Sequence, residues 1–224
     1  MEARYIRNLG ALTEADCDLL RQKKIAVVGC GGLGGYLMEY FSRIGIGAIR
    51  CIDGDCFDES NLNRQLLATT ETIGKPKADT AASRIHAVNP QIAVEPVCAF
   101  LDETNAAELI RGCDVVLDAL DNIPTRRLLA DACAAANIPY VFGAISGWVA
   151  QAGISMPGDR LIRTLYPEGI EVRDKTVLSF TPALCAALQV SLAVSLMIGH
   201  PVQTGVLHYF DLFCQEYEQL PLGK

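Results

Sequence analysis

The chain has 224 residues, half of them apolar and a fifth charged, which is typical of a globular protein that buries a full core without disulfide or metal staples. Its formal net charge of −7 argues against stable nucleic-acid binding but leaves room for a local basic site that binds a small anion. Nine cysteines without any C-x-x-C spacing, and an N-terminus without an apolar signal-peptide core, predict reduced thiols in a cytoplasmic protein.

Strand and helix patterns alternate through the first two thirds of the chain. Continuous apolar runs predict strands, and apolar residues at helical spacing predict the helices between them. Strands that are apolar on both faces indicate a mostly parallel sheet covered on both sides, an α/β fold of the Rossmann-like, doubly wound class. In chain order, we expect a helix over 13–22 capped by Thr13, a strand at 25–28, a helix over 33–44 closed by Gly45, a strand at 49–52, a helix over 75–88, a strand at 92–100, a helix from Thr104 to Arg111, a strand at 114–117, a helix over 124–136 and a strand at 140–142.

The pattern changes after Gly143. Residues 147–156 and 205–214 predict longer strands, and between them we expect a loop over about 157–180 and a helix that begins at Thr181-Pro182. The apolar stretch 183–198 is short for a membrane span, which needs ~20 apolar residues, so a buried core helix is expected. The sheet therefore gains a C-terminal mixed or antiparallel extension. We expect one domain over 1–224, with an N-terminal helical segment (1–24), a nucleotide-binding half (25–145) and the mixed-sheet extension (146–224).

A glycine-rich loop follows the strand at 25–28. Gly29, Gly31 and Gly34 fit the pattern G-x-G-x-x-G, and the loop leaves a strand and opens a helix, as that motif requires. Glycine lets a ligand approach the backbone, and the amides of a helix N-terminus bind phosphate. Asp53 ends the next strand, where a carboxylate can accept hydrogen bonds from ribose hydroxyls. The loop predicts an adenine nucleotide but does not distinguish a nicotinamide dinucleotide from ATP.

Three unusually polar segments help to choose between these ligands. Because ligands of a doubly wound sheet bind at its carboxyl edge, we expect the segments to meet there. Arg64 and Lys77 would bring two cations to a phosphate chain, and Asp121 would bring a carboxylate suited to Mg²⁺. This combination favours ATP with Mg²⁺. The segments are Asp53-Gly54-Asp55 with Asn61-Leu62-Asn63-Arg64-Gln65, Gly74-Lys75-Pro76-Lys77, and Asp121-Asn122.

Taken together, the glycine loop, Asp53-x-Asp55, Ser60-Asn61-Leu62-Asn63-Arg64-Gln65, Gly74-Lys75-Pro76-Lys77 and Asp121-Asn122 resemble the ThiF/MoeB/HesA family, the bacterial relatives of ubiquitin-activating enzymes. The resemblance runs from Arg4 through the helix at 182–199. It implies an ATP-dependent adenylyltransferase, a nucleotidyltransferase that activates the C-terminal carboxylate of a small ubiquitin-like sulfur-carrier protein. The carrier's Gly-Gly tail would become an acyl-adenylate, with release of pyrophosphate.

The resemblance also assigns roles to residues of this sequence. The family uses an N-terminal arginine that reaches in from the other subunit of a homodimer, and Arg7 matches that position. The extension would bind the carrier, and Asp121 would hold Mg²⁺. The implied nucleotide-binding residues are Gly29, Gly31, Gly32, Asp53, Asp55, Asn61, Arg64, Gln65, Lys77, Asp121 and Asn122, and the implied catalytic residues are Arg64, Lys77, Asp121 and Arg7.

The sequence departs from the family in its cysteines. Many relatives hold zinc with two C-x-x-C pairs, but residues 164–167 and 211–224 contain no such pair, so no zinc site is expected. Relatives that form a thioester or persulfide carry a cysteine in the crossover loop, and here only Cys185 is near. Its apolar neighbours favour a buried structural thiol. The chain would then only adenylate, leaving sulfur transfer to a partner.

Other functions stay open at this stage. One is a nicotinamide-dependent Rossmann oxidoreductase, against which the Arg64, Lys77 and Asp121 set argues. Another is a non-catalytic nucleotide-binding member of the same family. The adenylated carboxylate could also belong to a peptide or to a tRNA, of which the acidic charge disfavours the tRNA. Thiamine, molybdopterin, cysteine and natural-product sulfur routes all remain compatible with the sequence.

Overall fold

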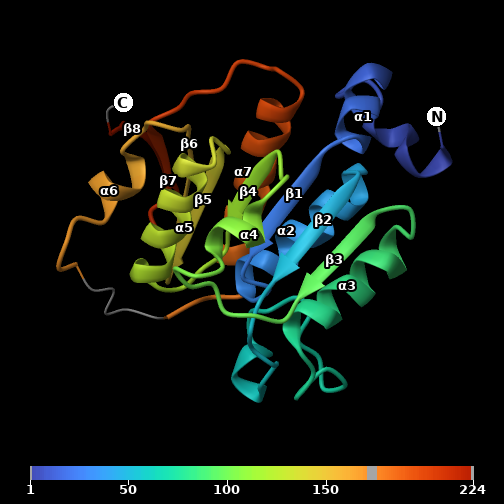
Figure 1. The fold of residues 1–224 in the computed structure, drawn as a ribbon, viewed down its shortest axis with the longest axis horizontal. Helices are drawn as coiled ribbons and strands as arrows, with labels where there is room; N and C mark the ends of the chain where they lie inside the picture. Colours follow the sequence, from blue (N-terminus) through green and yellow to red (C-terminus); the bar gives the residue numbers. More distant parts are fainter. Residues whose placement is uncertain (1, 171–175, 223–224) are drawn as a thin grey trace.

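The protein is built around one eight-stranded sheet, seen in a computed structural model that describes residues 2–170 and 176–222. The strand order is β3-β2-β1-β4-β5-β6-β7-β8 (Figure 1). The strands from β3 to β5 in this order are parallel, and β6, β7 and β8 add antiparallel pairs. The predicted fold class is confirmed. The strands are β1 (Lys24–Val28), β2 (Ala48–Ile52), β3 (Ala93–Val97), β4 (Val115–Asp118), β5 (Tyr140–Ser146), β6 (Val149–Ser155), β7 (Val206–Asp211) and β8 (Glu216–Pro221).

Helices cover both faces of the sheet, and each face has its own hydrophobic core. Successive residues of β1 alternate between the cores: Val27 packs with one cluster and Val28 with the other. The first cluster takes in α1 (Glu14–Arg21), α2 (Gly32–Ile44), α3 (Lys77–Val88) and α7 (Phe180–Met197), and the second takes in α4 (Ala106–Ile110), α5 (Ile123–Ala135) and α6 (Leu161–Leu165).

Two of the predicted helix boundaries rest on local signals that the structure confirms. Thr13 caps α1 in a capping box with Asp16, whose side chain accepts the Thr13 amide at 2.8 Å. Gly45 ends α2 in the left-handed conformation, with φ 92°. The predicted cap of α4 was wrong. Asp102 accepts the amides of Thr104 and Asn105, so the helix begins only at Ala106.

The C-terminal part differs most from the expectation. The strand predicted over 205–214 ends at Asp211 as β7, because the Asp211 carboxylate accepts the amides of Phe213 and Cys214 and turns the chain. The turn leads into β8, which was not predicted and which pairs with β7 in a hairpin. The predicted loop contains α6, which is held by buried Leu161 and Ile162; residues 171–175 of that loop lie outside the described part. The 3₁₀ helices η1 (Ala3–Asn8) and η2 (Glu59–Asn61) were not predicted.

Helix α7 is the long apolar helix of the chain. By length and composition it could cross a membrane, yet half of its residues Phe180–Met197 are buried inside the fold. It packs against α2, β5 and β6. This arrangement agrees with the core helix expected from the sequence.

The topology opens a crevice between the ends of β1 and β4. From β1 the chain moves outward to β2 and β3, and it then returns to β4 on the other side of β1. In a doubly wound sheet, ligands bind at such a switch point. Two glycines bring the walls together: a Cβ on Gly29 would lie 2.6 Å from the Ala119 carbonyl oxygen, and one on Gly34 would lie 1.8 Å from that of Gly29.

Candidate functional site

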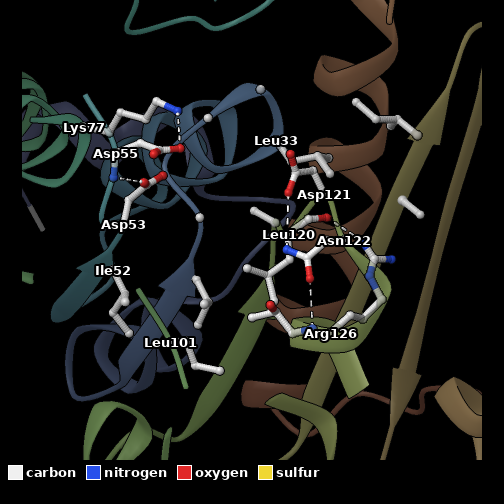
Figure 2. A pocket seen from close by; sticks show the side chains of 18 of the residues that line it. Leu33, Ile52, Asp53, Asp55, Lys77, Leu101, Leu120, Asp121, Asn122 and Arg126 are labelled. Atoms are coloured by element: carbon white, nitrogen blue, oxygen red, sulfur yellow. Dashed lines mark hydrogen bonds and ion pairs between the residues drawn. The ribbon is translucent and has the colours of Figure 1, made fainter. Parts of the chain in front are cut away.

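A pocket of about 430 Å³ opens at this switch point. It collects side chains from loops that are far apart in the sequence, with Asp53, Asp55 and Lys77 on one side and Asp121 and Asn122 on the other (Figure 2). The residues predicted for the nucleotide that line it are Gly29, Gly31, Gly32, Asp53, Asp55, Arg64, Gln65, Lys77, Asp121 and Asn122.

Two predicted residues lie outside the lining. Asn61 is 5% exposed, and its carbonyl oxygen accepts the amides of Arg64 at 3.2 Å and Gln65 at 2.9 Å. Asn61 therefore shapes the turn that carries those two side chains. Arg7 is exposed on η1, which packs near the Gly45 end of α2, away from the pocket end. Within one copy of the chain, the structure does not bring Arg7 to the pocket.

The carboxylate of Asp53 ties two loops together. Its oxygens accept the amide of Cys30 at 2.7 Å and the amide of Asp55 at 2.8 Å. The loops after β1 and β2 are thereby fixed to each other. Each carboxylate oxygen can accept a further hydrogen bond, so the geometry leaves room for the predicted ribose contact.

Lys77 enters the pocket from the first turn of α3. Its side chain is 9% exposed, and Nζ lies 3.2 Å from Asp55 Oδ2. Its amide also donates to the Asp55 carbonyl oxygen at 2.9 Å. Asp55 is more than half exposed, so this pair is open to the pocket on one side. Because the ammonium is already held in one place, an anion that binds it would cost little additional side-chain entropy.

The N-terminus of α2 points its amides into the same space. Gly31 is the N-cap, and no side chain caps the helix there. The first amides of a 13-residue helix are therefore left for a ligand, and helix dipoles favour an anion at this end. Gly31 and Gly32 line the pocket at this point. The cysteine between the motif glycines, Cys30, is fully buried, and burial raises its pKa well above the ordinary value.

Arg64 and Gln65 form the wall opposite the α2 terminus. Arg64 uses Nη1 to donate to the Ser60 carbonyl oxygen at 2.9 Å and to Asn63 Oδ1 at 2.8 Å, and its side chain lines the pocket. Gln65 is 7% exposed, and its Oε1 has no hydrogen-bond partner within the described part of the chain. A buried amide oxygen without a partner beside a pocket indicates that a ligand completes its hydrogen bonding.

Asp121 and Asn122 lie on the turn between β4 and α5. Asn122 caps α5 by accepting the Thr125 amide at 2.9 Å. Asp121 is exposed, and its Oδ1 lies 3.5 Å from Asn122 Nδ2. Mg²⁺ is often bound through one or two carboxylates together with substrate phosphates. An exposed carboxylate that faces the phosphate-binding loop fits that chemistry.

The rest of the pocket is mainly apolar on one side and mixed on the other. Apolar walls are made by Ile52, Leu101 and Leu120; Figure 2 shows Ile52 and Leu101 below Asp53, and Leu120 across the pocket beside Asp121. Such walls suit a flat nucleobase. On the far side, the pocket continues between β5, β6 and the segments that follow α6, where Gln151 and Tyr166 line it.

The thiol at position 185 lies inside the fold. Cys185 is fully buried, and its Sγ lies 3.2 Å from the Gln151 carbonyl oxygen. Burial raises its pKa to about 12, so the thiolate that a nucleophile needs is not formed near neutral pH. The expected buried structural thiol agrees with this environment. All nine cysteines are free, and Cys56, Cys98 and Cys214 are the exposed ones.

No metal cluster is apparent in the described ranges 2–170 and 176–222, where no three His, Cys, Asp or Glu side chains gather to hold an ion. Residues 223–224 of the tail considered for zinc lie outside these ranges. Trp148 lies on the surface. Its side chain is 44% exposed, and its ring centroid lies 5.2 Å from that of Phe180 and 5.7 Å from that of Phe213.

Three buried polar residues next to the pocket were not singled out from the sequence. Asp118 ends β4 and is fully buried, Arg126 is 4% exposed and Tyr140 is 2% exposed. Burial raises the pKa of Tyr140 well above its usual value, and the neighbouring Asp118 carboxylate adds to the effect. One signal was present: Asp118 follows the apolar run Val115–Leu117, and a buried carboxylate needs a partner.

Known proteins share both the sequence and the fold of this chain. The chain is 36% identical over 209 residues to the SAMP-activating enzyme E1 of Haloferax volcanii, covering 90% of this chain and 77% of the relative. It is 35% identical over 221 residues to the sulfur carrier protein adenylyltransferase of Thermus thermophilus (92% and 81%), and 31% identical over 206 residues to the molybdopterin-synthase adenylyltransferase of Escherichia coli (88% and 83%).

Solved structures of other proteins have the same fold as this chain. Escherichia coli MccB, in a structure with ATP, superposes with a TM-score of 0.86 at 22% identity, covering 100% of this chain and 73% of that one, a likeness of fold. Escherichia coli tRNA N6-threonylcarbamoyladenosine dehydratase, in complex with ATP, superposes with a TM-score of 0.74 at 25% identity (88% and 94%). The family model described as the ThiF family matches residues 4–224, and the chain therefore belongs to the ThiF family.

Proposed function

We propose that this protein is an ATP-dependent adenylyltransferase that activates the C-terminal carboxylate of a small ubiquitin-like sulfur-carrier protein. The observation that carries the proposal is a single pocket in which Lys77, Arg64 and the α2 N-terminus converge beside Asp121. The names of the relatives point to the same reaction class. A dinucleotide used for hydride transfer has no need of two cations and an open carboxylate at its phosphates.

In the proposed reaction, the carrier carboxylate attacks the α-phosphate of ATP and pyrophosphate leaves. A new bond forms between a carboxylate oxygen and phosphorus, and the bond from the α-phosphorus to the bridging oxygen breaks. The chain supplies no covalent nucleophile. Lys77 and Arg64 offset the negative charge that develops, and the α2 amides orient the phosphates. Loss of one such group commonly costs on the order of 10²–10³ in rate.

Magnesium is the metal that suits this site. Asp121 would hold it, with Asn122 beside it, and the remaining ligands would be phosphate oxygens and water. Bound Mg²⁺ supplies charge neutralisation on the phosphates. Asp53, with its two backbone hydrogen bonds already made, would accept the ribose hydroxyls.

The mixed-sheet extension, residues 146–224, would receive the carrier. Ser146 and Val149 line the pocket, and the exposed rings of Trp148, Phe180 and Phe213 lie beside them. A tail that leaves the pocket past the turn between β5 and β6 would bring its folded domain onto this apolar surface. Exposed aromatic groups are enriched at protein interfaces.

A homodimer would complete the site, with Arg7 of one subunit entering the pocket of the other. The exposed position of Arg7, at the opposite end of its own sheet from the pocket, supports a role between subunits more than within one. The protein would act in the cytoplasm, where its exposed cysteines stay reduced.

The test is ATP–pyrophosphate exchange with Mg²⁺ and a small ubiquitin-like protein that ends in Gly-Gly. Exchange should require the intact tail and should be lost in Lys77→Ala but retained in Lys75→Ala. Lys75 is exposed two residues away and does not line the pocket, so it is a matched control.

Other results would contradict the proposal. ATP binding without exchange for every carboxylate offered indicates the non-catalytic member of the family. Saturable binding of a nicotinamide dinucleotide, with no binding of ATP, indicates the oxidoreductase. Exchange that depends on a peptide or on a tRNA that bears a free carboxylate, and on none of the carriers, keeps the chemistry and replaces the substrate.

A further inference from the structure

A charged pair lies directly beneath the turn that carries Asp121. Arg126 Nε lies 3.2 Å from Asp118 Oδ2, and the Tyr140 hydroxyl donates to the same oxygen. Both charged side chains are at least 95% buried. Replacing a buried ion pair by apolar residues of similar volume often leaves the stability of a protein unchanged or raises it. A buried pair is therefore weak evidence of a role in stability. The pair therefore calls for another explanation.

Both residues of the pair also make hydrogen bonds to the backbone of the turn that carries Asp121. Asp118 Oδ1 accepts the Leu120 amide at 2.9 Å, and Arg126 Nη2 donates to the Leu120 carbonyl oxygen at 2.5 Å. Figure 2 shows Arg126 below Leu120, with the Asp121 carboxylate on the far side of the turn. The backbone amide and carbonyl oxygen of Leu120, one residue before Asp121, are thus both held by hydrogen bonds. One residue after it, Asn122 is fixed as the cap of α5.

The same arginine also contacts the opposite wall of the pocket. Its guanidinium carbon lies 4.7 Å from the ring centroid of Phe142, on β5, and 5.5 Å from that of Tyr166. Nη1 lies 3.5 Å from the Tyr166 hydroxyl oxygen. Arg126 and Tyr166 both line the pocket. One rigid side chain therefore joins the turn that carries Asp121 to the wall along which an acyl tail would lie.

We propose that Arg126, oriented by Asp118 and Tyr140, is a positioning residue that sets the direction of Asp121 relative to the acyl wall of the pocket. The inference rests on the proposed adenylation, in which Asp121 acts. A planar guanidinium with several donors in fixed geometry can hold a carboxylate, a carbonyl oxygen and an aromatic wall together, whereas the single ammonium of a lysine cannot.

Three variants test the proposal. Arg126→Lys keeps the charge but loses the forked geometry. Tyr140→Phe keeps the ring and removes one donor to Asp118, and it decides the matter where Arg126→Lys fails to fold. Arg127→Lys is the matched control, because Arg127 is the neighbouring residue on α5, does not line the pocket and pairs with Glu168, whose side chain is 89% exposed.

Two measurements are made on each folded variant. In Arg126→Lys, amide hydrogen exchange should become faster in the peptide that covers residues 119–122, while the peptides that cover β2 and α3 keep the wild-type rate. The kcat of ATP–pyrophosphate exchange should fall on the order of 10- to 100-fold, as expected for a small misplacement of a catalytic group. The KM for ATP should stay close to the wild-type value. Tyr140→Phe should show smaller changes in the same directions, and Arg127→Lys none.

Two results would overturn the proposal. A wild-type kcat in Arg126→Lys would show that Arg126 does not act through Asp121. Amide hydrogen exchange that becomes faster to the same extent in β2 and α3 as in residues 119–122 would show that Arg126 is only a packing residue. If the wild-type protein shows no pyrophosphate exchange with any carrier, the proposed function fails separately. Amide hydrogen exchange in Arg126→Lys then decides: faster exchange confined to residues 119–122 supports positioning, and a wild-type rate there contradicts it.

Discussion

The motif glycines fall into two physical kinds, and one substitution separates them. Gly29 and Gly34 are required by the fold, because an added Cβ would collide with backbone carbonyl oxygens at 2.6 and 1.8 Å. At Gly32, an added Cβ would meet only side-chain atoms of Pro182 and Arg64 at 3.7–4.0 Å, which is ordinary contact. Gly32 also begins α2. Nothing in the fold therefore requires glycine there, and we propose that the approach of the ATP phosphates does.

Gly32→Ala should make the protein more stable and a weaker binder of ATP. Replacing glycine by alanine in a helix stabilises by roughly 0.5–1 kcal/mol, which for a chain of this size raises Tm by about 1–4 °C. The methyl group would occupy the surface that the phosphates approach, and ATP affinity should fall at least about tenfold, or 1.4 kcal/mol. Thermal melts without nucleotide and calorimetry with ATP measure the two effects. Gly34→Ala, the contrast, should destabilise by about 1–3 kcal/mol or more.

Opposite signs for stability and affinity are the essential result for Gly32→Ala. Wild-type ATP affinity in a stabilised variant would refute the view that the phosphates approach this glycine. A lower Tm would refute the view that the fold tolerates a methyl group there.

Four more predictions concern the cysteines, a structural metal, α6 and Arg7. A thiol reagent at pH 8 should modify the three exposed cysteines and spare the six buried ones in the folded protein, Cys185 included because its pKa is about 12; rapid loss of a fourth thiol, assigned by peptide mapping, would contradict this burial. Chelator treatment without nucleotide should leave Tm unchanged, and a chelator-sensitive melt would point to a structural metal. Leu161→Ala, which removes a fully buried side chain of α6, should lower the free energy of unfolding by about 2–5 kcal/mol. Mixing inactive Arg7→Ala and Lys77→Ala proteins should restore pyrophosphate exchange, because a mixed dimer contains one site with both residues intact; no recovery after confirmed subunit exchange would confine Arg7 to another role.

The sequence predicted the strands other than β8, and the pocket residues that directly follow two of them. Apolar runs such as 25–28 and 114–117 mark buried parallel strands, and topology alone brings the residues after them to one edge. Asp53 and Asp121 were located in this way before any geometry was known. Asp55 and Asn122 follow the same rule because they stand beside these residues, whereas Arg64 and Lys77 lie on and after the long connection between β2 and α3.

Contacts between distant segments were beyond such reasoning. The Asp118–Arg126 pair joins the end of a strand to the second turn of a helix. Tyr140, which donates to Asp118, comes from another strand. Each residue alone has an ordinary surface or core explanation. Asn61 shows the converse: it lies inside the most polar segment, yet it points into the fold and supports the turn.

The charged groups of the pocket differ in how firmly the protein holds them. Asp53 is bound by two amides, Lys77 by Asp55, and Arg126 by Asp118 and a carbonyl oxygen. These groups are fixed before a ligand arrives, so in the proposed reaction they would not need to reorganise. Asp121 is exposed, and its contact with Asn122 is long, at 3.5 Å. A carboxylate that is left open on an otherwise fixed turn is suited to a group that enters with the substrate, as Mg²⁺ does with ATP, and this is why the rigidity of the turn matters more than any contact that Asp121 makes by itself.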